Sequence, residues 1–358
     1  MSNFYTDDKK TALEAVSDAQ RIAFAPFTFQ ATIALQDLGI LMAIDQSPQN
    51  CLRVEELHQQ TGLSHYGIKV LLDAGLSIGL VYLKDELYHL TKTAQFILHD
   101  KMTQVNLEFT RDFCYQGLSL LKESVKTGRP MGMSEYGDGD TLYPYLSSLP
   151  EPAKSSWFNF DHFYSDKAFS EALPKVFEHK PKLLLDIGGN TGKWAIQCTH
   201  YDADVQIRVL DLPIQLAVMR EHVATEGMSD RIKGISVDML DPAQMLPEGA
   251  DAIWMSQFLD CFAEDEILTI LRKTANVMGP DTRLYILELF WDRQMYEAAA
   301  YSLNCTSLYF TCFANGSSRM YHSKELLRIV QQAGLALVED QDNIGIGHTL
   351  LVCKRTSP

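Results

Sequence analysis

The sequence lacks long apolar runs. None of its hydrophobic stretches approaches the roughly 18 residues that a membrane-spanning helix needs. Residues 1–8 contain neither the basic region nor the apolar region of a signal peptide, and no internal repeat is apparent. We therefore expect a globular protein of the cytoplasm that has no membrane partner.

Cysteine pairs and basic clusters are also missing. The seven cysteines are odd in number and scattered, with no C-x-x-C arrangement, which argues against a disulfide framework or a zinc site. We expect buried thiols and no metal. Only 31 Lys and Arg stand against 46 Asp and Glu, giving a net charge of −15. Such a balance repels phosphate backbones, so we expect no nucleic-acid partner.

What is present is the composition of a globular protein, 46% hydrophobic and 22% charged, long enough for two domains. The pattern near the N-terminus predicts three helices followed by a β-hairpin, which is typical of a winged helix. The third helix offers only Lys69 as a firm cation, so we favour a dimerisation or scaffolding module over DNA recognition. The expected helices span 31–44, 54–61 and 67–76, and the strands span 80–83 and 87–90.

Residues 101–180 are expected to be mainly helical, with a loop at Gly128 to Gly139. A dense aromatic group follows this loop. Core packing is the default interpretation of the group. In a second interpretation part of it, Trp157 and Phe160 in particular, lines an aromatic acceptor pocket. The group comprises Trp157, Phe158, Phe160, Phe163, Tyr164 and Phe169.

From Lys182 onward, short apolar runs alternate with segments of helical length. This alternation predicts an α/β fold with a mainly parallel, doubly wound sheet. Ligands in such sheets bind beyond the carboxyl ends of the strands, at the point where the strand order reverses. The expected strands are 183–185, 207–210, 232–237, 252–255, 284–287, 335–338 and 349–352, and the expected helices include 214–226 and 265–277.

A glycine-rich turn, Asp186-Ile187-Gly188-Gly189-Asn190-Thr191-Gly192, directly follows the first of these strands. Glycines there let a ligand come close to the backbone amides. The spacing fits neither the G-x-G-x-x-G dinucleotide pattern nor a P-loop. Asp211 ends the second strand, and its carboxylate could accept hydrogen bonds from both hydroxyls of a ribose.

With these motifs, residues 181–354 resemble a class I S-adenosylmethionine-dependent methyltransferase. The whole chain resembles the small-molecule O-methyltransferases of the plant caffeate and bacterial polyketide type. The family's D-x-G-G-G-x-G motif is present with Asn190 in place of one glycine, and Asp211-Leu212-Pro213 matches its ribose-binding acid. Val237-Asp238-Met239-Leu240 matches the G-D-M-F segment, whose Asp and Met lie at the adenine. A similar sheet without a cofactor is the alternative.

The resemblance implies S-adenosylmethionine as the cofactor, S-adenosylhomocysteine as the product, and a homodimer in secondary metabolism. It implies a winged-helix dimerisation domain at 1–115, a helical connector at 116–180 that contributes to the acceptor pocket, and a seven-stranded Rossmann-like methyltransferase domain at 181–358. The expected cofactor residues are Asp186, Gly188, Gly189, Gly192, Asp211, Leu212, Asp238, Met239 and Ser256.

The catalytic position departs from the family. There, a His-Asp pair follows the fourth strand and the His removes a proton from the acceptor hydroxyl. In this sequence Asp260 stands at the His position and Cys261 at the Asp position. Glu288 matches one of the two family glutamates that hold the His, but no acid is present near the other, at 317–320.

Three explanations remain open. Asp260 is the base, which requires burial to raise its pKa, because an ordinary Asp near 4 is too weak for a phenol near 10. Alternatively, positioning against the sulfonium methyl, which can contribute about 7–11 kcal/mol, is enough for acceptors such as an activated ring carbon. In the third, catalysis is lost and the fold is a silent cofactor-binding scaffold or regulator. We favour an active enzyme, O-methylating rather than C-methylating, with Asp260 as the acid–base group.

His322, just before the helix expected at 324–333, is a further catalytic candidate, although capping that helix is its more common role. We interpret Cys261 as structural. The acceptor is expected to be small and aromatic or polyketide-like. Besides Trp157 and Phe160, the pocket candidates are Met255, Phe258, Trp291 and Tyr301, with core packing as the alternative for each.

Overall fold

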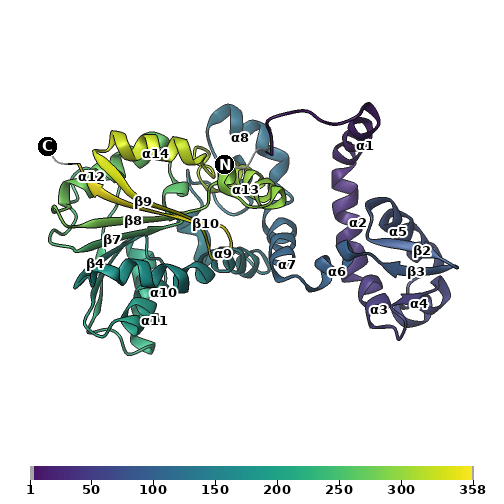
Figure 1. Ribbon diagram of the computed structural model, residues 1–358. Coiled ribbons are helices and arrows are strands. Elements are labelled where there is room, and N and C mark those ends of the chain that lie inside the picture. The colour runs from purple at the N-terminus through teal and green to yellow at the C-terminus, as the bar shows by residue number, and fades with distance from the viewer. Residues whose placement is uncertain (1–3, 357–358) are drawn as a thin grey trace. The chain divides into compact units, whose positions relative to one another are not determined.

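The computed structural model describes residues 4–356, apart from the side chains of residues 165 and 166. The chain forms two compact units, which meet in sequence at Glu108 and Phe109 (Figure 1). Each unit has its own hydrophobic core.

The first unit consists of helices around a small antiparallel sheet in the order β1-β3-β2. The hairpin expected at 80–90 is confirmed as β2 and β3, with Asp85 and Glu86 at positive φ in its turn. The strands are β1 (Cys51–Leu52), β2 (Val81–Lys84) and β3 (Leu87–Leu90). The helices are α1 (Ala12–Ala23), α2 (Ala25–Asp37), α3 (Ile40–Gln46), α4 (Val54–Thr61), α5 (His65–Ile78), α6 (Lys92–His99) and α7 (Lys101–Glu108).

One helix of this unit differs from the expectation. The single helix expected at 31–44 is wrong, because Gly39 takes the left-handed conformation, with φ of 75°, and separates α2 from α3. Ser64 caps α5 as expected, accepting a hydrogen bond of 3.1 Å from the Gly67 amide. Among the described residues no single helix is long and apolar enough to span a membrane, although α2 and α3 meet that criterion as a bent pair.

The second unit is built on a seven-stranded sheet, and the predicted α/β fold is confirmed. All seven expected strands are present, in the order β6-β5-β4-β7-β8-β10-β9. The five strands from β6 to β8 in this order are parallel, whereas β10 is antiparallel to both its neighbours. Their bounds are β4 (Leu183–Ile187), β5 (Gln206–Asp211), β6 (Ile232–Ser236), β7 (Ala252–Ser256), β8 (Arg283–Glu288), β9 (Leu335–Ile344) and β10 (His348–Arg355).

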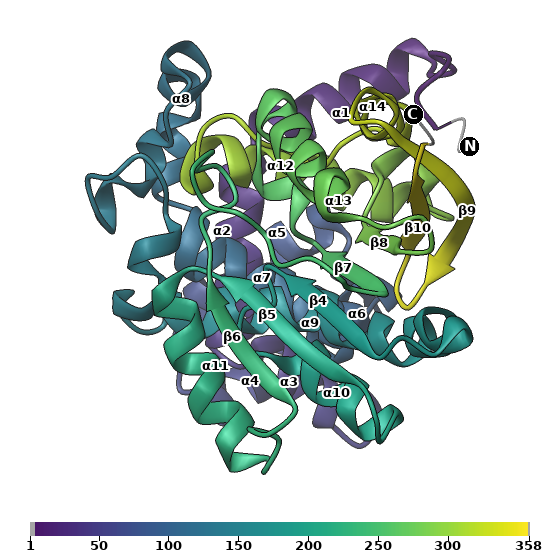
Figure 2. The ribbon, with the colours of Figure 1, turned by 90° about the vertical axis from the view of Figure 1, so that its left-hand side faces the viewer.

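Helices cover both faces of this sheet (Figure 2). The helices α9 (Ala153–Val176), α10 (Lys193–Tyr201) and α11 (Pro213–Thr225) pack on one face, and α12 (Glu264–Val277) and α14 (Ser323–Gln332) pack on the other. The strand order reverses between β4 and β7, so the expected ligand crevice lies at their carboxyl ends.

A third hydrophobic cluster combines segments that precede β4 in sequence with segments between β8 and β9. It includes Phe109 and Phe113 from a π-helical turn, Trp157 from α9, and Tyr309 from the end of α13. The remaining helices of the unit are α8 (Leu121–Thr127) and α13 (Glu297–Tyr309). The loop expected from Gly128 to Gly139 contains one short 3₁₀ turn, Met131–Glu135.

Candidate active site

The glycine turn joins the carboxyl end of β4 to α10. Gly188 and Gly192 have positive φ, 72° and 78°, which favours glycine. A Cβ on Gly188 would lie 2.3 Å from the Phe258 ring, and one on Gly189 would lie 2.5 Å from Asp186 Oδ2. The turn therefore leaves no room for side chains at positions 188 and 189.

Asp211 ties this turn to the neighbouring strand. Its Oδ2 accepts a hydrogen bond of 2.9 Å from the Asn190 amide, and its Oδ1 accepts one of 2.7 Å from the Leu212 amide. Burial raises the pKa of Asp211. Burial, together with the Asp211 carboxyl, raises the pKa of Asp186 to about 8. A ligand that donates hydrogen bonds to the Asp186 and Asp211 carboxyls would stabilise their charged forms.

Buried polar atoms without partners gather at the carboxyl ends of three strands. They are Asp186 Oδ2 on β4, Ser256 Oγ on β7 and Glu288 Oε2 on β8. An unpartnered buried polar atom is costly, and native proteins place such atoms where a ligand or water completes them. These residues and the glycine turn fit a polar, nucleoside-containing cofactor such as S-adenosylmethionine.

The segment matched to the adenine site follows β6. Asp238 Oδ1 accepts a hydrogen bond of 2.9 Å from the Leu240 amide, and Met239 is buried. The Lys273 ammonium of α12 donates to the carbonyls of Asp238 and Asp241, at 3.2 and 2.7 Å, which fixes this loop against the helix.

Asp260 lies in a short 3₁₀ turn, Leu259–Cys261, just beyond β7. The residue that enters this turn, Gln257, has a positive φ of 46°, a strained conformation common at functional sites. The Asp260 side chain is 5% exposed, and burial raises its pKa to about 7. The Cys261 thiol lies 3.5 Å from Asp260 Oδ1 and donates to it.

Glu288 at the end of β8 supports the same turn. Its Oε1 accepts hydrogen bonds of 3.0 and 2.9 Å from the amides of Phe258 and Leu259. Burial and the nearby Asp260 carboxyl raise the pKa of Glu288 well above its usual range. The pair of buried carboxyls therefore carries at most one negative charge near neutral pH.

Asn315 holds this turn from another segment, and sequence reasoning missed it. Its Nδ2 donates a hydrogen bond of 2.6 Å to the Cys261 carbonyl, and its Oδ1 accepts from the Ser317 and Ser318 amides at 3.0 Å. It lies just before 317–320, where the family acid is missing. The sequence could have indicated Asn315, because its polar side chain lies next to the segment where the family acid is absent.

The aromatic candidates of α9 belong to the third hydrophobic cluster. Trp157 is buried, and its Nε1 donates a hydrogen bond of 2.9 Å to Tyr309 Oη. Phe160 stacks on Phe109 with ring centroids 4.1 Å apart. The electrostatic influence of Asp161, also on α9, reaches both Asp260 and Tyr309. The aromatic group of α9 is therefore adjacent to the candidate catalytic turn.

Met255 and Tyr301 are not brought to this place, whereas Trp291 packs against the third hydrophobic cluster. Met255 is fully buried in the core of the sheet, and Tyr301 is 65% exposed on α13. His322 caps α14, accepting from the Lys324 amide at 3.1 Å, and its ring packs nearly perpendicular to that of Trp291, with centroids 5.1 Å apart. All seven cysteines are free. The expectation that all are buried is wrong for Cys305, which lies exposed on α13, and for Cys261, which is only partly buried.

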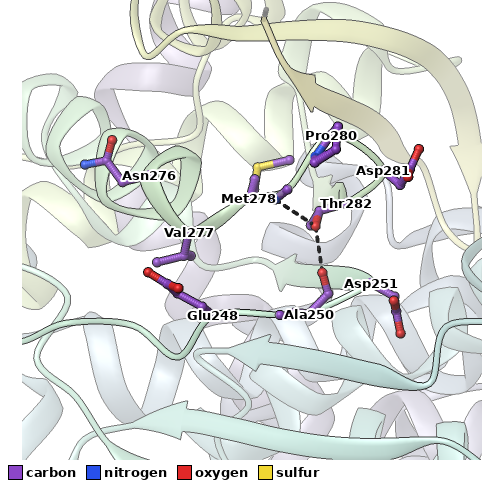
Figure 3. A pocket seen from close by; sticks show the side chains of 11 residues that line it. Glu248, Ala250, Asp251, Asn276, Val277, Met278, Pro280, Asp281 and Thr282 are labelled. Atoms are coloured by element: carbon purple, nitrogen blue, oxygen red, sulfur yellow. Dashed lines mark hydrogen bonds between the residues drawn. The ribbon is translucent and has the colours of Figure 1, made fainter.

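A surface hollow of about 430 Å³ lies at the opposite edge of the sheet. It is lined by 248–251, before β7, and by 276–282, before β8 (Figure 3). Thr282 closes its floor by donating to the Ala250 carbonyl at 2.6 Å. No predicted site residue lines it. Within the described part of the chain, no group of three or more His, Cys, Asp or Glu could hold a metal ion.

The sheet order, the glycine turn and the acidic residue that ends β5 define an S-adenosylmethionine-dependent methyltransferase, the class that the motifs indicate. Residues 166–336 match the family described as O-methyltransferase domain, and residues 17–88 match the Dimerisation2-like domain. The chain therefore contains this O-methyltransferase domain, and it is an S-adenosylmethionine-dependent methyltransferase.

The relatives are distant and chemically varied. The L-tyrosine C(3)-methyltransferase of Streptomyces lavendulae is 23% identical over 269 residues, which cover 74% of this chain and 72% of that protein. The 3-hydroxy-5-methyl-1-naphthoate 3-O-methyltransferase of Streptomyces sahachiroi is 25% identical over 256 residues, covering 70% and 72%.

Solved structures show the same fold at low sequence identity. The apo form of the S-adenosylmethionine-dependent methyltransferase SibL has a TM-score of 0.73 and 21% identity, covering 96% of this chain and 100% of that one. The mitomycin 7-O-methyltransferase MmcR has a TM-score of 0.69 and 18% identity, covering 97% and 100%.

Proposed function

We propose that this enzyme methylates a hydroxyl, or an activated ring carbon, of a small aromatic or polyketide-like acceptor, and that Asp260 is its acid–base group. The observation that carries the proposal is the burial of Asp260 between the glycine turn and the aromatic group of α9. Phe258, two residues earlier, packs on Gly188, and the charge of Asp161 acts on Asp260.

S-adenosylmethionine, when bound, supplies an electrophilic methyl group on a sulfonium sulfur. Asp211 would hold the ribose hydroxyls, and Asp186 and Ser256 would supply the polar atoms that lack partners in the free protein. Gly188, Gly189 and Gly192 let the turn pack where a Cβ would meet Phe258, Asp186 or Met219. Leu212, Asp238 and Met239 would line the nucleoside, as the resemblance implies.

The surroundings of Asp260 make its carboxylate a stronger base. An ordinary Asp near 4 lies about six pKa units below a phenol, whereas Asp260 at about 7 narrows the difference to about three. Removing the phenol proton activates both the oxygen and the ring carbon ortho to it. Relatives that act on a tyrosine carbon and on a naphthoate hydroxyl support both outcomes.

We also propose a homodimer formed through the first unit, whose arrangement of helices and hairpin we interpret as a winged helix. Helix α1 has no buried residue, and its Leu13 and Ile22 are 82% and 75% exposed. An apolar helix face that continues into the Dimerisation2-like domain at 17–88 supports coverage by a second copy. We keep the division at 1–115, 116–180 and 181–358 as a proposal. The free thiols support a reducing compartment, the cytoplasm.

The test is methyl transfer from labelled S-adenosylmethionine to L-tyrosine, 3-hydroxy-5-methyl-1-naphthoate and a panel of phenols. Asp260→Asn should lower kcat by about a hundredfold or more. The control Asp265→Asn, at an exposed site on α12, should keep the wild-type rate. Calorimetry with S-adenosylhomocysteine should give equal affinity for all three proteins, which separates lost chemistry from lost folding.

Two results would contradict the proposal. An Asp260→Asn enzyme with the wild-type rate would mean that positioning alone is sufficient. A wild-type protein that binds S-adenosylhomocysteine but methylates nothing in the panel would favour the second function, a silent cofactor-binding scaffold.

A further inference from the structure

Tyr143 carries a buried hydroxyl that the mechanism has not used. It begins the 3₁₀ turn Tyr143–Ser148, which is anchored by the fully buried Leu142 and by a hydrogen bond of 2.8 Å from the Leu142 amide to the Ala314 carbonyl. The ring packs in the third hydrophobic cluster. Its Oη is buried and has no hydrogen-bond partner.

The neighbours of this hydroxyl belong to the catalytic turn. Burial raises the pKa of Tyr143 well above its usual range, and Cys261, Tyr309 and Asp260 raise it further. The hydroxyl therefore stays protonated at neutral pH and is available as a hydrogen-bond donor. The Cys261 thiol donates to Asp260, and its sulfur is only a weak acceptor for Tyr143, with which it makes no hydrogen bond of ordinary geometry. Tyr309 already accepts from Trp157.

A buried hydroxyl without a hydrogen bond lowers the stability of the folded protein. Native proteins keep such groups mainly where a ligand or water supplies the missing partner. The site also has a chemical need for a donor. The phenol proton must reach a carboxylate about three pKa units more acidic, which is about a thousandfold unfavourable equilibrium. A donor aimed at the forming phenolate reduces that barrier.

We propose that Tyr143 Oη donates a hydrogen bond to the acceptor oxygen whose proton passes to Asp260. The inference rests on the proposed function. The acceptor O–H bond breaks, its proton goes to the Asp260 carboxylate, and the electron pair stays on the oxygen or delocalises to the ortho carbon. Tyr143 stabilises that pair without changing its own protonation. The same contact serves O- and C-methylation.

Tyr136 provides a matched control. It lies in the same cluster, but its Oη already donates a hydrogen bond of 2.8 Å to the Phe113 carbonyl. Tyr136→Phe should therefore lower the melting temperature. Tyr143→Phe removes a hydroxyl with no partner, so the melting temperature should stay unchanged or rise. A clear loss of stability in Tyr143→Phe would mean that the hydroxyl is bonded within the protein, and would overturn the proposal.

Binding provides the second readout. We would titrate 2-naphthol and naphthalene into the protein saturated with S-adenosylhomocysteine. The wild type and Tyr136→Phe should prefer 2-naphthol, and Tyr143→Phe should lose about tenfold of that preference. An equal preference in Tyr143→Phe and wild type, or a wild type that does not distinguish the two compounds, would overturn the proposal.

The pH profile separates a donor from a structural group. In Tyr143→Phe, kcat should fall about tenfold to a hundredfold at pH 7 and recover as the pH approaches the acceptor's own pKa, because solvent then removes the proton. A deficit independent of pH would contradict the proposed role. A wild type that methylates none of the panel would refute the proposed function, while the melting and binding comparisons would still decide whether Tyr143 recognises a hydroxyl.

Discussion

Glu288 supports Asp260 through the backbone of its turn. Its Oε1 accepts from two consecutive amides before Asp260, and the two buried carboxyls are close enough for the charge of one to raise the pKa of the other. In the family that the chain resembles, the matching glutamate holds a His side chain. Here Glu288 instead bonds the backbone amides that precede Asp260. Glu288 therefore keeps a positioning role although Asp260 stands where the family has His.

The contact between Gly188 and Phe258 predicts a specific loss. Gly188→Ala and Gly227→Ala both place alanine at positive φ, 72° and 69°, at a similar backbone cost of about 1 kcal/mol. Only the first brings Cβ against a ring, since nothing lies within 4 Å at Gly227. We expect Gly188→Ala alone to lose affinity for S-adenosylhomocysteine, measured by calorimetry. Equal affinities in the two variants would refute this reason for the glycine.

Asp211 should contribute to cofactor affinity through its charge. Asp211→Asn keeps the shape but weakens hydrogen bonds to ribose hydroxyls, so the affinity for S-adenosylhomocysteine should fall about tenfold to a hundredfold. Asp204→Asn, just before the other end of β5, is the control, because Asp204 is exposed. A wild-type affinity in Asp211→Asn, measured in the same titration, would remove Asp211 from the site.

The pH dependence of methyl transfer should respond to Asp161. If Asp260 is the base, kcat falls as the pH drops below about 7, where its carboxylate takes up a proton. The charge of Asp161 raises that pKa, so Asp161→Asn should move the acidic limb to lower pH. The shift should be roughly half a pH unit, because Asp161 is partly exposed and screened.

The control is Glu171→Gln, at the far end of α9, where the side chain accepts from the Gly345 amide. It should leave the pH profile unchanged. A limb that does not move in Asp161→Asn, or moves to higher pH, would contradict the assignment of that limb to Asp260. The titratable groups that act on Asp260 or respond to it are Asp161, Cys261, Glu288, Tyr143 and Tyr321.

His348 should make the fold sensitive to acid. It is fully buried at the start of β10, neither ring nitrogen has a hydrogen-bond partner, and burial lowers its pKa to about 4. Because the unfolded chain binds this proton with a pKa near 6.5, the free energy of unfolding should decrease as the pH falls from about 6.5 to 4. The total loss should be about 3 kcal/mol.

Urea denaturation across this range measures the effect. His348→Leu should flatten the decline relative to wild type, whereas His200→Leu, at an exposed site on α10, should not. Other acids that titrate in the range, such as Asp186, are common to all three proteins and cancel in the comparison. Parallel declines in wild type and His348→Leu would contradict the prediction.

Strands and helices with regular apolar spacing could be predicted from the sequence. The seven sheet strands and the expected helices corresponding to α11, α12 and α14 are confirmed, since burial on a sheet face imposes a periodicity that local reading detects. Their bounds agree to within a few residues except in β9, which extends six residues beyond its expected end at 338. The break at Gly39 could not be predicted, because one left-handed residue interrupts a pattern without changing its apolar spacing. The two-residue β1 was too short to leave a pattern.

The catalytic surroundings were less accessible to prediction. The family resemblance indicated Asp260, which lies shortly after β7, and Glu288, which ends β8. Tyr143 and Asn315 lie in irregular segments, and they meet the turn only through long-range packing. Met255 and Tyr301 were predicted to line the pocket from their residue types alone. Met255 is buried in the core and Tyr301 is exposed, because residue type does not determine which surface a side chain faces.

The place of β10 bears on how the enzyme acquires its shape. Glu288 pairs with Thr349, 61 positions later in the chain, so β8 keeps an open edge during synthesis until that late segment has emerged and inserted between β8 and β9. Contacts so distant in sequence form slowly. Strand β8, whose last residue Glu288 holds the catalytic turn, is therefore among the last strands of the sheet to gain both neighbours. An incompletely synthesised chain exposes the unpaired edge of β8, and chaperones cover edges of this kind.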